Sequence, residues 1–387
     1  MITPERSIAA MSPVVSAEVF EVKAAFSTPY KLSKAYGTLA TTRAVLLKLT
    51  DADGIVGWGE ANPLQPFTAE SPAQAALALR ETLLPAILGI SNPAPRRVDA
   101  LLDALLAEHL CAKGAVTMAL LDILGKRIGT SVAMLLGGAL REAVPVLWPL
   151  GSGSAEDDMR VIDERAPQGF STFMLKMGSA PVRDEVQRVA QVEARYGDRL
   201  TLIADANQGW TREEAGEFLA GVKGSKLCFV EQPVAKHDLD GMVMLAKTSE
   251  LPISADESLT SLADAGRIAS LRAAQVFSIK SSKNGGPLRA QRIEAVASAF
   301  GIRCYMNSML EFGITQAASL QHAVTISNLV EAGHAFMSTM RLAEDPTDFS
   351  SFVRAGTVHL PSAPGLGIQV DETHVRRMAT NSLLLGV

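Results

Sequence analysis

The hydrophobic pattern divides the chain into two parts. Before about residue 140, two strand-like segments, 16–26 and 43–60, are followed by amphipathic stretches typical of helices. Residues 51–54 read Asp-Ala-Asp-Gly, which favours a hairpin turn within the second segment. Ser71-Pro72 favours a helix start, with serine as the N-cap and proline at the first helical position. Strands followed by helices predict an α+β domain.

The segment between the two predicted strands, residues 27–41, is long and rich in turn-forming residues. Connections of that length without regular structure are usually functional or mobile. We therefore expect a functional or mobile loop at this position.

The second part of the chain alternates short apolar runs with amphipathic stretches. This alternation indicates parallel strands joined by right-handed crossovers, and about eight such units over roughly 200 residues fit a (β/α)8 barrel. A doubly wound open sheet is the alternative, but no glycine-rich phosphate loop follows the first strand. The predicted strands are 144–150, 172–177, 200–206, 227–233, 251–257, 275–282 and 302–308, with a weaker eighth run at 331–337.

Composition narrows the class of protein. The chain has 387 residues, of which 48% are hydrophobic and 20% charged, so a large core is expected and disorder is not. The net charge of −5 argues against nucleic acid or an anionic membrane as a partner. No apolar run is long enough for a spanning helix. Residues 1–15 do not resemble a secretory signal, and we expect a partly disordered lead-in. Three widely spaced cysteines do not form a disulfide framework, which favours a reducing cytoplasm.

Three acidic residues fall at the ends of consecutive predicted strands: Asp205, Glu231 and Asp256, one βα unit apart. The carboxyl ends of barrel strands converge on one face, where active sites form. Three neighbouring carboxylates would repel one another unless a hard cation bound them, and Mg²⁺ prefers such oxygen ligands. The alternative is that each acid caps the helix that follows it.

Two lysines follow the same spacing. Lys176, in the apolar stretch STFMLKMG, lies one unit before Asp205, and Lys280 lies one unit after Asp256. Burying an unpaired ammonium is costly, so a lysine in such a stretch suggests a functional demand. We expect the two ammonium groups to flank the metal from opposite sides.

This arrangement suits removal of a proton next to a carboxylate. A bound Mg²⁺ stabilises the enolate oxygens by several kcal/mol, and a neutral lysine can take the proton. An unperturbed lysine has a pKa of about 10.4, so the site must lower it through a neighbouring cation or an apolar wall.

The motifs together resemble the muconate-lactonizing-enzyme subgroup of the enolase superfamily. They are GIVGWGEA in the first part, LLGG at 135–138, and DAN, EQP, ADES, IKSSKNGG and NSMLEFG in the second. The resemblance covers nearly the whole chain. It implies an enolase-like modified (β/α)8 barrel over 140–345, an N-terminal α+β capping domain over 14–130, and a C-terminal segment, 346–387, that returns to the cap.

The resemblance also implies roles for individual residues. Asp205, Glu231 and Asp256 match the Mg²⁺ ligands, and Lys176 and Lys280 match the acid/base pair. Loops such as 27–41 and 60–67 are expected to close over the barrel mouth and set specificity. A lysine at 280, rather than a His-Asp pair, argues against the mandelate-racemase subgroup, and a homo-oligomer is expected.

Four further positions need comment. The subgroup usually has Lys-x-Lys on the second strand, and Met174 replaces the first lysine here. Asn207 and Glu257 are expected to support the metal site, or else to cap helices. Glu311 resembles an acid that some members place near the substrate carboxylate, where a protonated carboxyl could donate to the enolate; a solvated loop acid is the alternative.

The predicted site residues indicate a class of reaction more closely than they indicate a substrate. Two bases suit racemisation or epimerisation, and our first expectation is a racemase or epimerase of an amino-acid-derived carboxylate, such as an N-substituted amino acid or a proline derivative. A dehydratase of a hydroxyproline-type acid comes second and a muconate-type cycloisomerase third. Dipeptide epimerases carry Asp-x-Asp at the eighth strand, and no such motif occurs after residue 331. A non-catalytic relic of the fold would be expected to lose ligands, and none is missing.

Overall fold

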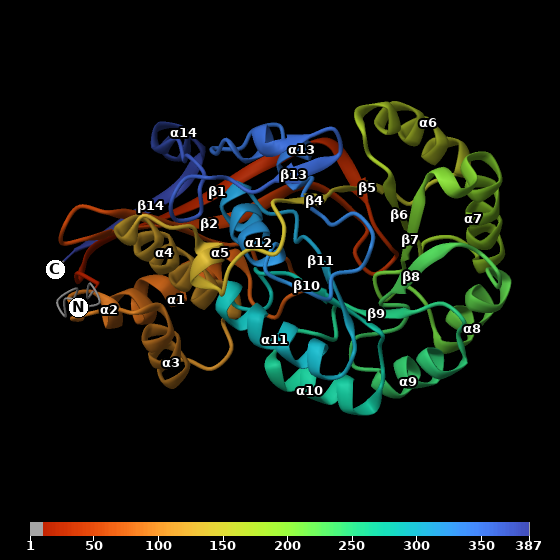
Figure 1. Ribbon diagram of the computed structural model, residues 1–387, viewed down its shortest axis with the longest axis horizontal. Helices are drawn as coiled ribbons and strands as arrows, with labels where there is room; N and C mark the ends of the chain where they lie inside the picture. Colours follow the sequence, from red (N-terminus) through yellow and green to blue (C-terminus); the bar gives the residue numbers. More distant parts are fainter. Residues whose placement is uncertain (1–10, 387) are drawn as a thin grey trace, which may run out of the picture.

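The computed structural model describes residues 11–386 and places a cap beside a barrel (Figure 1). Residues 1–10 of the predicted lead-in lie outside this range. The cap contains an antiparallel sheet in the order β14-β1-β2-β3, so the last strand of the chain pairs with the first. Its strands are β1 (Val14–Lys31), β2 (Thr38–Asp51), β3 (Val56–Ala61) and β14 (Ala379–Gly386).

Helices cover one side of the cap sheet. They are α1 (Pro72–Ala78), α2 (Leu84–Ile87), α3 (Pro95–Leu105) and α4 (Leu110–Ile128). Helix α1 begins as the sequence predicts. The Ser71 hydroxyl accepts from the backbone nitrogen of Gln74, and the Gln74 side-chain oxygen accepts from the backbone nitrogen of Ser71. Helix α4 lies very close to β3: a methyl group at Gly59 would come within 1.9 Å of the Ala115 carbonyl oxygen. Only glycine permits this approach.

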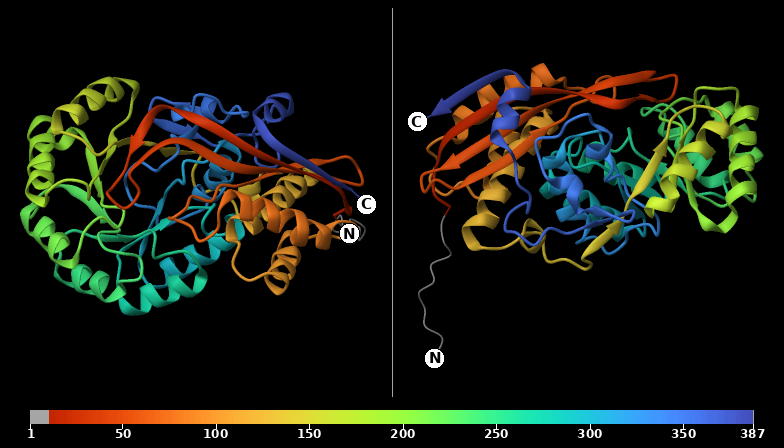
Figure 2. Two further views of the ribbon diagram at one scale, coloured as in Figure 1. Left: turned by 180° about the vertical axis from the view of Figure 1, so that it is seen from behind. Right: turned by 90° about the horizontal axis from the view of Figure 1, so that it is seen from above.

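The β1–β2 hairpin is longer than the sequence analysis predicted. Strand β1 runs on to Lys31 and β2 begins at Thr38, so only 32–37 form the turn, not 27–41. The pairing shifts register between Ala25 and Tyr30, which breaks the alternation that marks a strand in the sequence. The hairpin extends from the cap across the barrel (Figure 2).

Seven parallel strands form the barrel sheet, in the order β11-β10-β9-β8-β7-β6-β5. Each lies within a predicted run, and the barrel class is confirmed. The strands are β5 (Leu147–Leu150), β6 (Thr172–Lys176), β7 (Thr201–Asp205), β8 (Leu227–Glu231), β9 (Ile253–Ala255), β10 (Val276–Ile279) and β11 (Arg303–Met306). The helices that follow them are α6 (Ala155–Arg165), α7 (Val182–Tyr196), α8 (Arg212–Gly221), α9 (Leu239–Thr248), α10 (Leu262–Leu271), α11 (Pro287–Ala299) and α12 (Gly313–Ala323).

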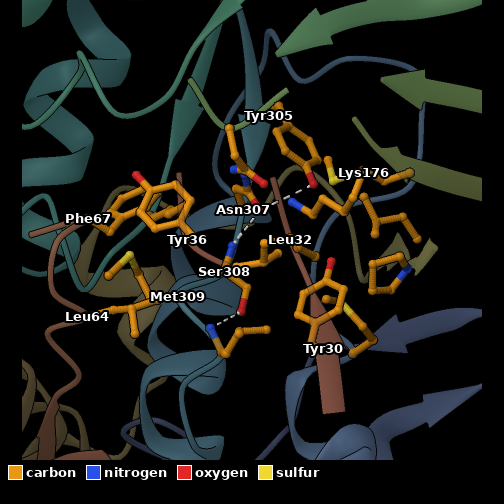
Figure 3. Close-up of a pocket in the computed structure, with 18 residues that line it drawn as sticks. Tyr30, Leu32, Tyr36, Leu64, Phe67, Lys176, Tyr305, Asn307, Ser308 and Met309 are labelled. Carbon is orange, nitrogen blue, oxygen red and sulfur yellow. Dashed lines mark hydrogen bonds between the residues drawn. The ribbon is translucent and has the colours of Figure 1, made fainter. Parts of the chain in front are cut away.

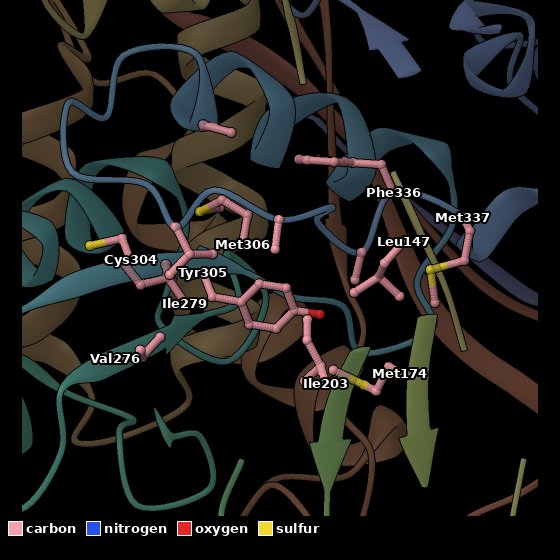
Figure 4. Packing of buried hydrophobic residues seen from close by; sticks show 14 of the residues in the cluster. Leu147, Met174, Ile203, Val276, Ile279, Cys304, Tyr305, Met306, Phe336 and Met337 are labelled. Atoms are coloured by element: carbon pink, nitrogen blue, oxygen red, sulfur yellow. The ribbon is translucent and has the colours of Figure 1, made fainter. Parts of the chain in front are cut away.

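The eighth run closes the barrel without forming a regular strand. Leu329 bridges to Cys304 of β11, and His334 bridges to Val146 beside β5. Gly333 allows this approach, since a methyl group there would lie 2.7 Å from the Leu147 nitrogen. Apolar side chains fill the interior, and Tyr305 reaches into the space between the strands (Figure 4).

Glu60, at the end of β3, joins the cap to the barrel. Its two carboxylate oxygens accept the backbone N–H groups of Phe312, at 2.8 Å, and Thr315, at 2.9 Å, at the start of α12. Burial raises the pKa of Glu60 to about 8. These buried hydrogen bonds fix the position of the cap relative to the barrel. The candidate site lies between the cap and the barrel.

Asp122 also links separate segments of the chain through hydrogen bonds to its buried carboxylate. Its carboxylate accepts from the Trp58 nitrogen at 3.0 Å, the Leu366 nitrogen at 2.9 Å and the Lys126 ammonium at 2.7 Å. Asp122→Ala leaves these donors unpaired, so we expect the free energy of unfolding to fall by about 3 kcal/mol. Urea unfolding measures this, with the exposed Asp240→Ala as control. A loss no larger than the control's would refute the assignment.

No helix within residues 11–386 is both long and apolar enough to cross a membrane.

Candidate active site

The predicted site residues come together at the carboxyl end of the barrel sheet. Lys176, Asp205 and Glu231 are the last residues of β6, β7 and β8, and they are in register: Lys176 pairs with Asp205, and Asp205 with Glu231. Neighbouring strands lie about 4.8 Å apart, so these side chains form one row. Asp256 and Lys280 directly follow β9 and β10 and continue it.

Ion pairs link this row. The Lys176 ammonium contacts an Asp205 carboxylate oxygen, and the Lys280 Nζ lies 2.6 Å from Asp256 Oδ2. Both lysines and all three acids are buried. The predicted set is thus brought together, with a lysine at each end of the three acids.

Glu231, in the middle of the row, has a free oxygen. Its Oε1 accepts from Asn307 Nδ2 at 2.6 Å and from Ser278 Oγ at 3.0 Å. Its Oε2 is buried without a hydrogen-bond partner. Burial, and then the charges of Asp205 and Asp256, raise the pKa of Glu231 well above its usual range. A cation near Oε2 would satisfy this oxygen and relieve the repulsion.

The donor set fits a hard divalent cation. It consists of carboxylate oxygens from three adjacent strands, which Mg²⁺ prefers. Among residues 11–386, no three carboxylate, histidine or cysteine side chains already converge on one point. Asp205 and Asp256 are instead paired with the two lysines, which supply the positive charge.

The charge state of Lys176 differs from the sequence-based expectation. Burial alone would lower its pKa, but the carboxylates of Asp205 and Glu231, together with Tyr30, outweigh burial and raise it. The same holds for Lys280, where Asp256 is the main opposing charge. The expected lowering of the lysine pKa is therefore absent while the carboxylates neutralise the ammonium groups. If a divalent cation bound those carboxylates, they would stabilise the charged form of the lysines less.

A third lysine belongs to the cluster and was missed in the sequence. Lys283 Nζ lies 2.6 Å from Asp256 Oδ1 and 3.0 Å from the Ser278 carbonyl oxygen. Burial and the neighbouring Lys280 lower its pKa. A turn brings it back to the row, because Asn284 Oδ1 accepts from the Lys280 nitrogen at 2.9 Å. The feature of the sequence that could have identified Lys283 is its position in the motif IKSSKNGG.

Asn207 and Glu257 lie beside Asp205 and Asp256. The Asn207 backbone donates to Asp205 Oδ1 at 2.8 Å, and its amide Nδ2 lies 3.4 Å from Glu257 Oε1. Tyr36, on the hairpin turn, donates to the same Glu257 oxygen at 3.2 Å. Burial and the nearby Asp256 raise the pKa of Glu257 to about 8. These residues connect the acids to the cap.

Glu311 is buried close to the site, but it does not line the cavity. Its Oε1 accepts from Gln316 Nε2 at 2.6 Å, and its Oε2 accepts from Ser308 Oγ at 2.9 Å and from the Met309 nitrogen. Ser308 and Met309 themselves line the cavity. Through these hydrogen bonds Glu311 positions the 308–311 loop.

A cavity lies over the lysines (Figure 3). Lys176 and Lys280 both line it, and the cap supplies aromatic rings above them. The Lys280 Nζ lies 4.0 Å from the centroid of the Phe67 ring, and the Lys176 Nζ lies 5.9 Å from that of Tyr30. The walls are mainly apolar: Tyr30, Leu32, Tyr36, Leu64, Phe67, Leu147, Pro149, Met174, Tyr305, Met309, Leu310, Ala335 and Met337.

Two family descriptions match this chain. Residues 158–374 match the family described as "Enolase C-terminal domain-like". Residues 14–137 match "Mandelate racemase / muconate lactonizing enzyme, N-terminal domain". The chain belongs to the enolase superfamily, in its muconate-lactonizing-enzyme subgroup.

Relatives in this superfamily cover nearly the whole chain. Muconate cycloisomerase 1 of Pseudomonas putida is 32% identical over 91% of this chain and 94% of its own. The L-Ala-D/L-Glu epimerase of Bacillus subtilis is 30% identical over 92% of this chain and 96% of its own. The crystal structure of N-succinyl Arg/Lys racemase from Bacillus cereus ATCC 14579 superposes with a TM-score of 0.92 at 25% identity, covering 96% of this chain and all of that one. The protein is therefore an enzyme of the enolase superfamily, whose members generally use Mg²⁺.

Met174 is the clearest departure from the subgroup pattern. It is 2% exposed, lines the cavity and points to the same side of β6 as Lys176. We expect Met174→Lys to keep a working site, because a neighbouring cation favours the neutral base as an apolar wall does. Met174→Asp adds a carboxylate that holds Lys176 protonated, so we expect turnover at pH 7 to fall by about tenfold or more and to recover partly at higher pH. A pH–rate profile of Met174→Asp that matches the parent's would refute this role.

Proposed function

We propose that the protein is a Mg²⁺-dependent racemase or epimerase of an amino-acid-derived carboxylate, such as an N-substituted amino acid or a proline derivative. One observation carries the proposal: Lys176 and Lys280, on strands separated by the three that bear the acids, line the same cavity. Two bases on opposite sides of one carbon atom allow a proton to leave one face and return to the other.

In this proposal Asp205, Glu231 and Asp256 hold Mg²⁺. When bound, the ion stabilises the negative charge that develops on the substrate carboxylate as the α-proton leaves. The Nζ of Lys176 takes the proton from one face of the α-carbon, and the ammonium of Lys280 returns a proton to the other. For the opposite stereoisomer the two lysines exchange roles. The apolar walls and the cap rings exclude water from the exposed carbanion.

The eighth segment of the barrel supports a substrate without a free ammonium group. Ala335 and Met337 line the cavity there, and the acid of this segment, Glu331, is almost fully exposed. No carboxylate at this position faces the substrate, so an N-substituted amino group is the better fit.

The test is a screen of α-substituted carboxylates in D₂O with Mg²⁺, followed by NMR. N-acyl amino acids and proline derivatives should exchange the α-hydrogen and lose optical purity at related rates. Exchange without loss of optical purity, or elimination of water from a hydroxyproline-type acid, would replace this proposal by the dehydratase.

Cycloisomerisation is a further candidate, which the relatives favour. The relatives at 31–33% identity include several muconate cycloisomerases, and the same pair of lysines and the same acids could serve that reaction. The assay is the disappearance of muconate with Mg²⁺ present. Turnover of muconate, together with no exchange in the amino-acid screen, would favour it.

Closure of the hairpin turn should accompany substrate binding. Ser33 Oγ donates to the Asn207 carbonyl oxygen at 2.9 Å, and the Lys34 nitrogen donates to that of Gly178 at 3.0 Å, so residues 32–37 lie on the barrel mouth. We expect bound substrate to slow amide hydrogen exchange at these residues by about tenfold or more, because the turn then opens less often. Equal exchange with and without substrate would contradict closure.

A further inference from the structure

Asn307 lies where the candidate cavity meets the row of acids. It directly follows β11, and it lines the cavity together with its neighbours Tyr305 and Ser308 (Figure 3). Its side chain is buried, and its amide nitrogen donates to the carboxylate of Glu231. Asn307 belongs to the motif NSMLEFG, but no step of the proposed proton transfer uses it.

Two donors fix the orientation of the Asn307 amide. Its Oδ1 accepts from the backbone nitrogen of Ser308 at 2.8 Å and from the hydroxyl of Tyr305 at 3.4 Å. A backbone N–H donates and cannot accept, so the amide atom that faces it must be the oxygen. The Nδ2 group therefore faces Glu231, and a reversed amide would place its oxygen against a carboxylate oxygen.

The neighbouring Ser278, on β10, completes a closed set of hydrogen bonds around one oxygen of Glu231. Glu231 Oε1 accepts from Asn307 Nδ2 at 2.6 Å and from Ser278 Oγ at 3.0 Å. The Asn307 Nδ2 also lies 2.9 Å from Ser278 Oγ, so each of the three side chains holds the other two. A carboxylate oxygen has two lone pairs, and here both have a donor.

The other oxygens of the three acids are held in a different way. Lysine ammonium groups contact the carboxylates of Asp205 and Asp256. A divalent cation repels those ammonium groups, so its arrival weakens these contacts. The amide and the hydroxyl on Glu231 Oε1 are neutral and stay in place. Among the residues that the structure describes, Glu231 Oε2 has no hydrogen-bond partner and is open to the cation.

We propose that Asn307, together with Ser278, limits Glu231 to one oxygen for the cation and thereby makes the site select Mg²⁺ over Ca²⁺. Mg²⁺ requires a nearly octahedral set of single oxygen atoms, whereas Ca²⁺ takes about six to eight ligands and often both oxygens of one carboxylate. Asn307 is thus a positioning residue that acts through Glu231. This inference rests on the part of the proposed function that assigns Mg²⁺ to Asp205, Glu231 and Asp256.

The experiment measures cation binding without substrate. Calorimetric titration of the full chain gives the dissociation constants for Mg²⁺ and for Ca²⁺. We expect the parent to bind Mg²⁺ more tightly. Asn307→Ala should shift the ratio of the two constants toward Ca²⁺ by about tenfold or more, because the released Oε1 of Glu231 becomes a second ligand for Ca²⁺. Ser278→Ala removes the other donor and should shift the ratio in the same direction.

Crystal structures with Ca²⁺ give a second readout. In the parent, one oxygen of Glu231 should lie within about 2.6 Å of the ion, and in Asn307→Ala both oxygens should do so. Asn381→Ala is the matched control, since Asn381 is exposed on β14 and its Nδ2 donates to Glu21 Oε1 at 2.9 Å. It removes the same kind of hydrogen bond outside the site and should leave the ratio unchanged.

Asn307→Ala could weaken binding of both cations by the same factor, as a purely structural role predicts, and that result would overturn the inference. A parent that prefers Ca²⁺, or a ratio that neither Asn307→Ala nor Ser278→Ala changes, would also overturn it and leave the proposed reaction untouched. A parent that binds neither cation would remove the proposed ligand set and this inference together. If Asn307→Ala does not fold, Ser278→Ala alone decides, because it keeps the Asn307 amide in place.

Discussion

Lys280→Ala should stop the interconversion of stereoisomers and still exchange the α-hydrogen of one of them with solvent. The reason is positional: Lys280 and Lys176 lie at opposite ends of the row of acids and line the same cavity, and in the proposed mechanism each faces one side of the α-carbon. Lys176→Ala should show the mirror-image behaviour. Interconversion should fall by about 10³-fold or more in each variant, the usual range for loss of a general base.

The measurement is α-hydrogen exchange in D₂O, followed by NMR, for each stereoisomer separately. Lys236→Ala is a suitable control, since Lys236 is exposed, does not line the first cavity and forms no ion pair within residues 11–386. A lysine variant that interconverts stereoisomers near the parent rate would exclude the two-base mechanism. Loss of exchange for both stereoisomers in both variants would favour elimination or cycloisomerisation, where one lysine is the base and the other gives electrostatic support.

Glu231→Ala should abolish turnover while leaving the fold intact. Removal of Glu231 takes an acceptor from the buried donors of Asn307 and Ser278, but it also removes a buried carboxylate that Asp205 and Asp256 repel, so the two effects on the free energy of unfolding oppose each other. If Glu231 is the central metal ligand, as proposed, its loss removes several kcal/mol of stabilisation of the developing negative charge, which corresponds to at least about 10³-fold in kcat/KM.

Two measurements separate these effects. Calorimetric titration with Mg²⁺ should show binding to the parent and to Glu217→Ala, an exposed acid on α8, and much weaker binding to Glu231→Ala. Thermal unfolding without Mg²⁺ should give similar midpoints for all three proteins. Undiminished Mg²⁺ binding by Glu231→Ala would remove Glu231 from the proposed ligand set.

The barrel was predictable because its signals are local and repeated. Each of β5 to β11 is a short apolar run between amphipathic stretches, and an acid or a lysine marks the carboxyl end of each strand from β6 to β10. The hairpin was harder, because the register shift between Ala25 and Tyr30 interrupts its alternation. The eighth segment lacks a strand pattern, since Gly333 and its neighbours close the barrel through isolated bridges.

The site residues that recur at the spacing of one βα unit could be predicted from the sequence. Lys283 escaped because a turn, and not a strand, returns its ammonium to Asp256. Tyr30 and Phe67 lie in the loops 27–41 and 60–67 that the resemblance placed over the barrel mouth, but no local pattern identified these two rings as the ones that face the lysines. The raised pKa of Lys176 depends on how closely Asp205 approaches it, which the spacing of residues does not determine.

The pairing of β14 with β1 has a consequence for synthesis on the ribosome. Strand β1 emerges before every strand of the barrel, and its partner at 379–386 emerges after all of them. Until then one edge of β1 has unpaired backbone groups, an edge open to pairing with other chains. The barrel can therefore assemble before the cap sheet is complete, and a nascent chain that stalls before residue 379 exposes that edge. Cell extracts should accordingly contain more aggregated protein for chains truncated before β14 than for full-length chains.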